Sequence, residues 1–145
     1  MSKKIAVVIL PTYNEKGNIG AAIHTLETEV FPKIKDYEMK ILVADDLSPD
    51  GTADEVKVFM KKYKNISITQ GEKKGLGAAY VRGMTYAIEK MDADVLFEMD
   101  GDGQHDPADL PKLTAPIISG QADLVIGSRF LQKQKKPIDR LLIKW

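Results

Sequence analysis

The chain of 145 residues has the length of one domain, and its 43% hydrophobic and 29% charged residues are typical of a soluble globular protein. Lysine plus arginine equals aspartate plus glutamate at 21 residues each, so the net charge gives no reason to expect a nucleic-acid partner. The absence of cysteine excludes a disulfide framework and cysteine-bound zinc, and it suits a cytoplasmic location.

The first part of the chain alternates short apolar runs with helical patterns. Ile5–Leu10 is apolar throughout, as expected of a strand that is buried on both faces. The run stops at Pro11, too short to span a bilayer, so we expect a strand and not a signal peptide. Asn18 can cap a helix whose apolar residues share one face, namely Ile19, Ile23, Leu26 and Val30. Lys40–Ala44 predicts a second buried strand.

The same alternation continues through the middle of the chain. Thr52 and Glu55 have the spacing of a capping box. The helix behind them is expected to bury Val56, Phe59, Met60 and Tyr63. Ile66–Thr69 predicts a third strand, and Leu76–Lys90 predicts a helix. The expected inner side of that helix holds Leu76, Ala79, Tyr80, Met84, Ala87 and Ile88.

The last elements complete an α/β pattern. Asp94–Met99 predicts a fourth strand, Asp106–Pro107 starts a helix with Asp106 as its cap, and Leu124–Ile126 predicts a fifth strand. We therefore expect a single domain over residues 1–145, with a mostly parallel sheet and helices on both faces. In such a doubly wound fold, ligands bind beyond the carboxyl ends of the strands.

An acidic loop follows the predicted fourth strand. Asp100 and Asp102 are two residues apart, so their carboxylates point the same way in an extended backbone, and a divalent cation relieves their repulsion. Gln104 repeats the step with a neutral oxygen, and such an oxygen-rich set suits Mg²⁺ or Mn²⁺. The alternative is a Gly/Asp turn that leads into a helix capped by Asp106. His105 is expected to be structural.

Other loops at the same edge carry candidate ligand contacts. Lys73–Gly77 opens the third helix, whose N-terminus can face an anion, although a tight turn is the favoured interpretation. Arg129 follows the predicted fifth strand, where a guanidinium can bind a diphosphate. Asp45 can accept from a base or ribose, Tyr13 can stack on a base, and Glu15 can hold a hydroxyl. For each of these three, a role in a turn or helix start is an equal alternative.

Five motifs occur in a characteristic order: PTYNE, DDLSPDGT, KKGLGAAYVRGM, MDGDGQHDP and GSRF. Together they cover about residues 5 to 130, and they resemble the family 2 glycosyltransferases of the GT-A fold. Within that family the resemblance is to the polyprenyl (dolichyl) phosphate mannose synthase group. DDLSPDGT followed by KGLGAAY points to this lipid-phosphate branch.

The resemblance implies a set of site residues. For the donor nucleotide-sugar these are Pro11, Tyr13, Glu15, Val43, Asp45, Gly101, Arg129 and Arg140. The metal ligands it implies are Asp100 and Asp102, as the family's DxD motif, with Gln104 as the third. Asp102 and Arg129 are the implied catalytic residues: the metal held by Asp102 would stabilise charge that develops on the leaving nucleotide, and Arg129 would share that role.

The implied reaction is an inverting transfer of a sugar, mannose from GDP-mannose, to a polyprenyl or dolichyl phosphate. The alternatives are another donor or acceptor, such as UDP-glucose or a polysaccharide, and a nucleotide-sugar-binding module without turnover. Members of the family usually continue well past residue 145, so we expect a C-terminal truncation. The basic segment 129–145 is then the start of the acceptor-side region, and peripheral association with the cytoplasmic membrane face follows.

Overall fold

The computed structural model describes residues 2–128. The chain separates into two compact units, residues 1–111 and 112–145, and each is described by itself. Arg129 and Arg140, two of the predicted site residues, lie outside the described residues. The expectation of a single domain stays a prediction.

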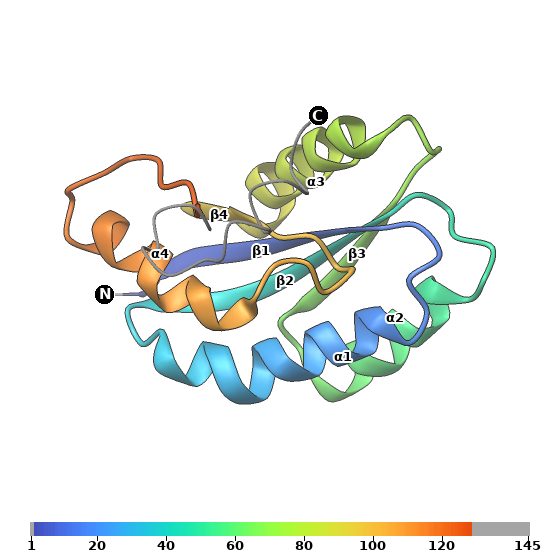
Figure 1. Ribbon diagram of the computed structural model, residues 1–145, viewed down its shortest axis with the longest axis horizontal. Coiled ribbons are helices and arrows are strands. Elements are labelled where there is room, and N and C mark those ends of the chain that lie inside the picture. The colour runs from blue at the N-terminus through green and yellow to red at the C-terminus, as the bar shows by residue number, and fades with distance from the viewer. Residues whose placement is uncertain (1, 129–145) are drawn as a thin grey trace, which may run out of the picture. The chain divides into compact units, whose positions relative to one another are not determined.

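The first unit is built on a four-stranded parallel sheet (Figure 1). Its strands are β1 (Lys4–Thr12), β2 (Tyr37–Asp45), β3 (Ile66–Gln70) and β4 (Val95–Glu98). The order β3-β2-β1-β4 means that the chain winds outward from β1 to β3 and then crosses to the other side of β1. The topological switch point therefore lies between β1 and β4, where ligands of such sheets bind. The first four predicted strands and the doubly wound fold are confirmed.

Helices cover both faces of this sheet. One face carries α1 (Asn18–Thr25) and α2 (Thr52–Lys62), and the other carries α3 (Leu76–Met91), as Figure 1 shows. α1 continues into a π-helical turn, η1 (Leu26–Val30), and a 3₁₀ turn, η2 (Phe31–Lys33). The four apolar residues predicted for this helical face are all buried.

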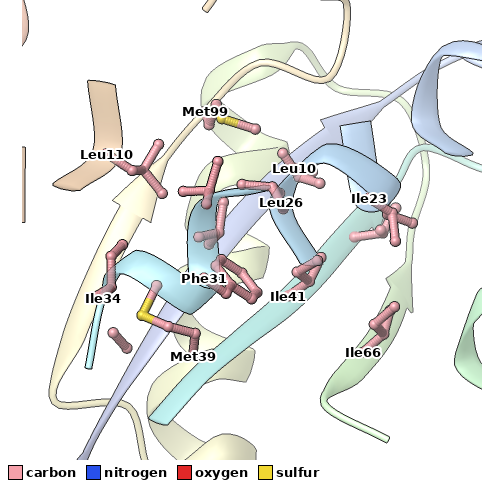
Figure 2. Packing of buried hydrophobic residues seen from close by; sticks show 14 of the residues in the cluster. Leu10, Ile23, Leu26, Phe31, Ile34, Met39, Ile41, Ile66, Met99 and Leu110 are labelled. Atoms are coloured by element: carbon pink, nitrogen blue, oxygen red, sulfur yellow. The ribbon is translucent and has the colours of Figure 1, made fainter. Parts of the chain in front are cut away.

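Alternate residues of β1 supply two separate apolar clusters. Val8 and Leu10 pack with α1 and α2 in the larger cluster, which Figure 2 shows around Leu26 and Phe31. Val7 and its alternate partner Ile9 instead pack beneath α3. β1 therefore buries both of its faces, which is why its sequence is apolar without a break.

The residues expected to cap α1 and α2 do not do so. The N-cap positions are Gly17 and Gly51, with φ of +88° and +93°, and neither helix has a side-chain capping bond. Glycine enters these helices because its missing Cβ permits the left-handed region. Thr52, the first residue of α2, bonds to a neighbouring loop instead of closing a capping box with Glu55.

α3 lies very close to the sheet through its small residues. Its buried stripe consists of Ala79, Gly83, Ala87 and Met91. A Cβ on Gly83 would lie 2.7 Å from Ile9 Cγ2, so only glycine permits this approach. The prediction that Leu76 and Ile88 face inward is wrong, because this stripe turns both side chains to solvent, where they are 56% and 57% exposed.

The predicted fifth strand does not form. Residues 124–126 have no regular secondary structure, and Leu124 and Ile126 are 77% and 78% exposed. Three apolar residues offer few ladder hydrogen bonds, and no strand within residues 2–128 pairs with them. Before them lie η3 (Pro107–Asp109) and α4 (Leu110–Ile118). Asp106 does cap η3, since its Oδ1 accepts from the backbone N–H of Ala108 at 2.9 Å.

Among residues 2–128, no helix is both long enough and apolar enough to cross a membrane.

Candidate functional site

A cavity of about 250 Å³ opens at the carboxyl ends of β1 and β4. Its position is the switch point of the sheet, which is where the fold alone predicts a ligand. The lining residues come from the ends of the strands and from the start of α3. They are Pro11, Thr12, Tyr13, Glu15, Asp46, Lys73, Gly75, Leu76, Ala79, Asp100, Gly101 and Asp102. Six of the predicted site residues therefore share one cavity.

The loop that carries Tyr13 and Glu15 is held by the loop after β2. Four successive backbone N–H groups, those of residues 14–17, each donate to a side chain of residues 48–55. The acceptors are Ser48 Oγ at 3.0 Å, Thr52 Oγ1 at 3.0 Å, Asp50 Oδ2 at 3.1 Å and Glu55 Oε2 at 2.6 Å. Residues 48–55 thus supply polar partners to a loop that has no ladder of its own.

Replacing Thr52 with valine is expected to lower the free energy of unfolding by about 1.5 kcal/mol, because the buried hydroxyl accepts from the N–H of Glu15 and donates to Asp50 at 2.6 Å. The hydroxyl bond is also the largest cause that lowers the pKa of Asp50, so the same change should raise that pKa towards its usual value. Urea unfolding and a carboxyl NMR titration measure the two effects. An unchanged Asp50 pKa would contradict this account of the loop.

Asp45 is fully buried and is not among the residues that line the cavity. Its Oδ1 accepts from Thr12 Oγ1 at 2.9 Å and from Ser48 Oγ at 2.6 Å, and its Oδ2 accepts from Ser48 N at 3.0 Å and Gln70 Nε2 at 3.2 Å. Val43 is fully buried in the larger apolar cluster. The contact of these two residues with a donor base stays a prediction.

Asp46 takes the place on the cavity wall that we predicted for its neighbour. Its carboxylate pairs with Arg82 of α3, whose Nη2 donates to Asp46 Oδ1 at 2.8 Å. Both side chains are largely buried, so the pair joins the loop after β2 to α3. The adjacent acids in DDLSPDGT were the signal for a second candidate, but periodicity cannot tell which of two neighbouring carboxylates faces the ligand.

Lys73 and Tyr13 meet at this cavity. The Lys73 ammonium lies 3.6 Å from the centroid of the Tyr13 ring, the geometry of a cation–π contact. Lys73 was predicted as part of a segment that opens the third helix and can face an anion, with a tight turn as the favoured interpretation. The structure places it among the lining residues, where it is the one cation that residues 2–128 contribute.

The acidic loop after β4 brings Asp100, Gly101 and Asp102 to the cavity wall. Tyr80 of α3 donates its hydroxyl to Asp100 Oδ1 at 2.7 Å. Burial and then Asp100 itself raise the pKa of Tyr80 far above its usual value, so the phenol keeps its proton. The backbone N–H of Asp100 donates to His105 Nδ1 at 3.0 Å, which agrees with a structural role for that histidine.

Gln104 is the predicted metal ligand that the structure does not bring to the cavity wall. Its backbone N–H donates to Asp102 Oδ1 at 3.0 Å, which closes a tight turn. Gly103 within this turn has φ of +83°, so a glycine is required there. Gln104's role as a third ligand stays a prediction.

The residues on this wall fit a hard divalent cation. Within residues 2–128, no group of three His, Cys, Asp or Glu side chains could hold a metal by itself. Two carboxylates on one wall nevertheless match Mg²⁺ and Mn²⁺, which take few protein ligands and keep positions for water and phosphate oxygens. The wall also carries the carboxylates of Glu15 and of Asp46, which is paired with Arg82, and these negative charges would repel an anionic ligand. A bound cation and Lys73 together would offset that repulsion.

A family model described as Glycosyl transferase family 2 matches residues 7–145. The undecaprenyl-phosphate mannosyltransferase of Micrococcus luteus is 37% identical over 96% of this chain and 55% of its own. A UDP-N-acetylglucosamine–dolichyl-phosphate N-acetylglucosaminyltransferase of Methanococcus voltae is 30% identical over 89% of this chain and 53% of its own. The chain thus spans about half the length of these curated relatives.

A solved structure shares the fold at lower identity. The mannosyltransferase PcManGT from Pyrobaculum calidifontis, in complex with GDP-Man and Mn²⁺, has a TM-score of 0.64. The match covers 88% of this chain and 35% of that one at 22% identity. The doubly wound fold seen here is therefore shared with a protein whose structure was solved with a nucleotide sugar.

Proposed function

The chain belongs to glycosyl transferase family 2, and we propose that it transfers mannose from GDP-mannose to a polyprenyl phosphate. The observation that carries the proposal is the pair Asp100 and Asp102 on the wall of a cavity at the switch point of the sheet. The relative from Micrococcus luteus supports the choice of mannose and of a polyprenyl phosphate acceptor. A reaction on a lipid phosphate also supports peripheral association with the cytoplasmic face of a membrane.

Asp100 and Asp102 are the residues proposed to hold Mg²⁺ or Mn²⁺, with Gln104 as a further ligand. The cation neutralises charge on the donor diphosphate and on the leaving nucleotide when it is bound. The support from this chain is the chemistry of the two carboxylates, because hard oxygen ligands are the ones these ions prefer.

The remaining wall is proposed to bind and orient the donor. Tyr13 offers a ring to the base, Glu15 accepts from a hydroxyl, and Pro11 and Gly101 supply backbone surface without bulk. Arg129 and Arg140 are proposed to face the diphosphate, where a guanidinium binds two oxygens at once. Asp45 and Val43 then act by shaping the floor beneath the base.

The proposed step needs no strong general base. A phosphate monoester oxygen is already ionised near neutral pH, so it can attack the anomeric carbon directly. The new carbon–oxygen bond forms as the bond from that carbon to the diphosphate breaks, and the electron pair leaves with the nucleoside diphosphate. Attack from the face opposite the leaving group inverts the anomeric carbon. Arg129 would stabilise the negative charge that develops on the leaving side, and Asp102 would contribute through the cation that it is proposed to hold.

A second donor has an observation in its favour. The relative from Methanococcus voltae is named for UDP-N-acetylglucosamine, and it keeps a dolichyl phosphate as the acceptor. The fold and the acidic pair are compatible with either nucleotide. The two proposals therefore differ only in the base and the sugar of the donor.

Calorimetry on the purified 145-residue chain tests these proposals. GDP-mannose, UDP-glucose and UDP-N-acetylglucosamine are titrated with and without Mn²⁺, and transfer to a short polyprenyl phosphate is followed by chromatography. We expect Mn²⁺-dependent binding of GDP-mannose and formation of a lipid-linked mannose. Binding without transfer would favour a nucleotide-sugar-binding module. If no nucleotide bound under any condition, both the transferase proposal and the binding-module alternative would be contradicted.

A further inference from the structure

Tyr80 connects the core of the first unit to the acidic loop. Its ring packs against the apolar cluster beneath α3, which includes Ile9 and Leu42. Its hydroxyl reaches out of that cluster and donates to Asp100 Oδ1 at 2.7 Å. The aromatic ring is therefore fixed by packing while its polar end meets the cavity wall.

Asp100 is held at two points, whereas Asp102 is not. The backbone N–H of Asp100 donates to His105 Nδ1, and its carboxylate accepts from Tyr80. The Asp102 carboxylate accepts from the backbone N–H of Gln104, within its own loop. Among the two acidic side chains, Asp100 is thus the one tied to a helix of the scaffold.

The bond to Tyr80 restricts the orientation of a carboxylate that would otherwise turn. The Asp100 side chain is 29% exposed, so water could solvate several of its rotamers. A carboxylate oxygen accepts up to two bonds, so the phenol occupies one acceptor site of Oδ1, while His105 Nε2 lies 3.8 Å from Oδ2 and acceptor sites remain for a cation. Partners of this kind fix the direction in which a ligating group presents its lone pairs.

We propose that Tyr80 is a positioning residue, which holds the Asp100 carboxylate in the orientation that receives the divalent cation. The proposal rests on the proposed function, because it assumes that Asp100 is a ligand. It adds a residue from outside the acidic motif, twenty positions earlier in the chain, whose hydroxyl has no other evident task.

The test compares Tyr80→Phe with Tyr86→Phe. The first change removes the hydroxyl and keeps the ring; the second removes a hydroxyl from the same helix at a position that lines a different cavity. Calorimetry measures the Mn²⁺ concentration that gives half-saturation in the presence of GDP. We expect this concentration to rise about tenfold in Tyr80→Phe and to stay unchanged in Tyr86→Phe.

A second measurement separates positioning from a loss of structure. In metal-free buffer, the thermal unfolding midpoint of Tyr80→Phe should fall by only a few degrees, as expected for the loss of one hydrogen bond, and excess Mn²⁺ should restore full GDP binding. A larger fall in the midpoint together with GDP binding that excess Mn²⁺ does not restore would overturn the proposal in favour of a structural role.

Failure of the inference and failure of the proposed function look different. If the unaltered protein and Tyr80→Phe half-saturate at the same Mn²⁺ concentration, Tyr80 does not position Asp100, and the proposed function is untouched. If the unaltered protein shows no Mn²⁺-dependent binding of GDP, the proposed function fails and the inference falls with it.

Discussion

Replacing Asp102 with alanine is expected to abolish the Mn²⁺-dependent binding of the donor and to reduce transfer by at least about 100-fold. Asp102 lines the cavity beside Asp100, so its loss leaves one carboxylate on that wall. The change should cost little stability, because the side chain is exposed and bonds only within its own turn. Calorimetry with GDP-mannose and an assay of transfer measure the two effects.

Asp36→Ala is the matched control for this experiment. Asp36 is an exposed aspartate just before the amino end of β2, the edge of the sheet opposite to the cavity. It removes the same charge at a distance from the site, so donor binding should be unchanged. A folded Asp102→Ala protein that kept Mn²⁺-dependent transfer would contradict the metal assignment.

Replacing Asp45 with asparagine is expected to lower the free energy of unfolding by about 3 kcal/mol. The buried carboxylate accepts from four donors, two at each oxygen. An amide presents only one oxygen, so its nitrogen would face two of these donors and leave them without an acceptor. Urea unfolding followed by circular dichroism measures the loss.

The same variant distinguishes the structural role of Asp45 from the predicted contact with the donor base. Asp36→Asn serves as its control, since that side chain is exposed. A large loss of stability is the result that the four hydrogen bonds require. Wild-type stability combined with weakened nucleotide binding would instead show that the carboxylate serves the ligand and not the loop.

Much of the sheet was predictable because its strands are buried on both faces. Such strands appear as unbroken apolar runs, and Ile5–Leu10 and Lys40–Ala44 both lie within strands of the structure. The run Leu124–Ile126 has the same character and forms no strand. An apolar run shows that burial is available, but a strand also needs a neighbour with which to pair.

Helix starts were predicted less well, because a polar side chain at a helix start can bond either to its own helix or to a distant loop. Thr52 and Glu55 have capping-box spacing, and a capping box satisfies donors within one helix. In the structure both side chains serve the backbone of residues 15 and 17, which lie more than thirty positions earlier. Local spacing cannot reveal an acceptor that is contributed to a distant loop.

The sequence by itself determined the alternation of strands and helices, the acidic loop after the fourth strand, and the motifs that resemble a family. These are local properties, set by periodicity and by the order of residue types. Only the tertiary structure decided that Asp46 and not Asp45 reaches the cavity, that Lys73 lies over Tyr13, and that Tyr80 bonds to Asp100. Those pairings depend on the register of parallel strands and on how closely α3 approaches the sheet, and both are fixed by packing between segments far apart in the chain.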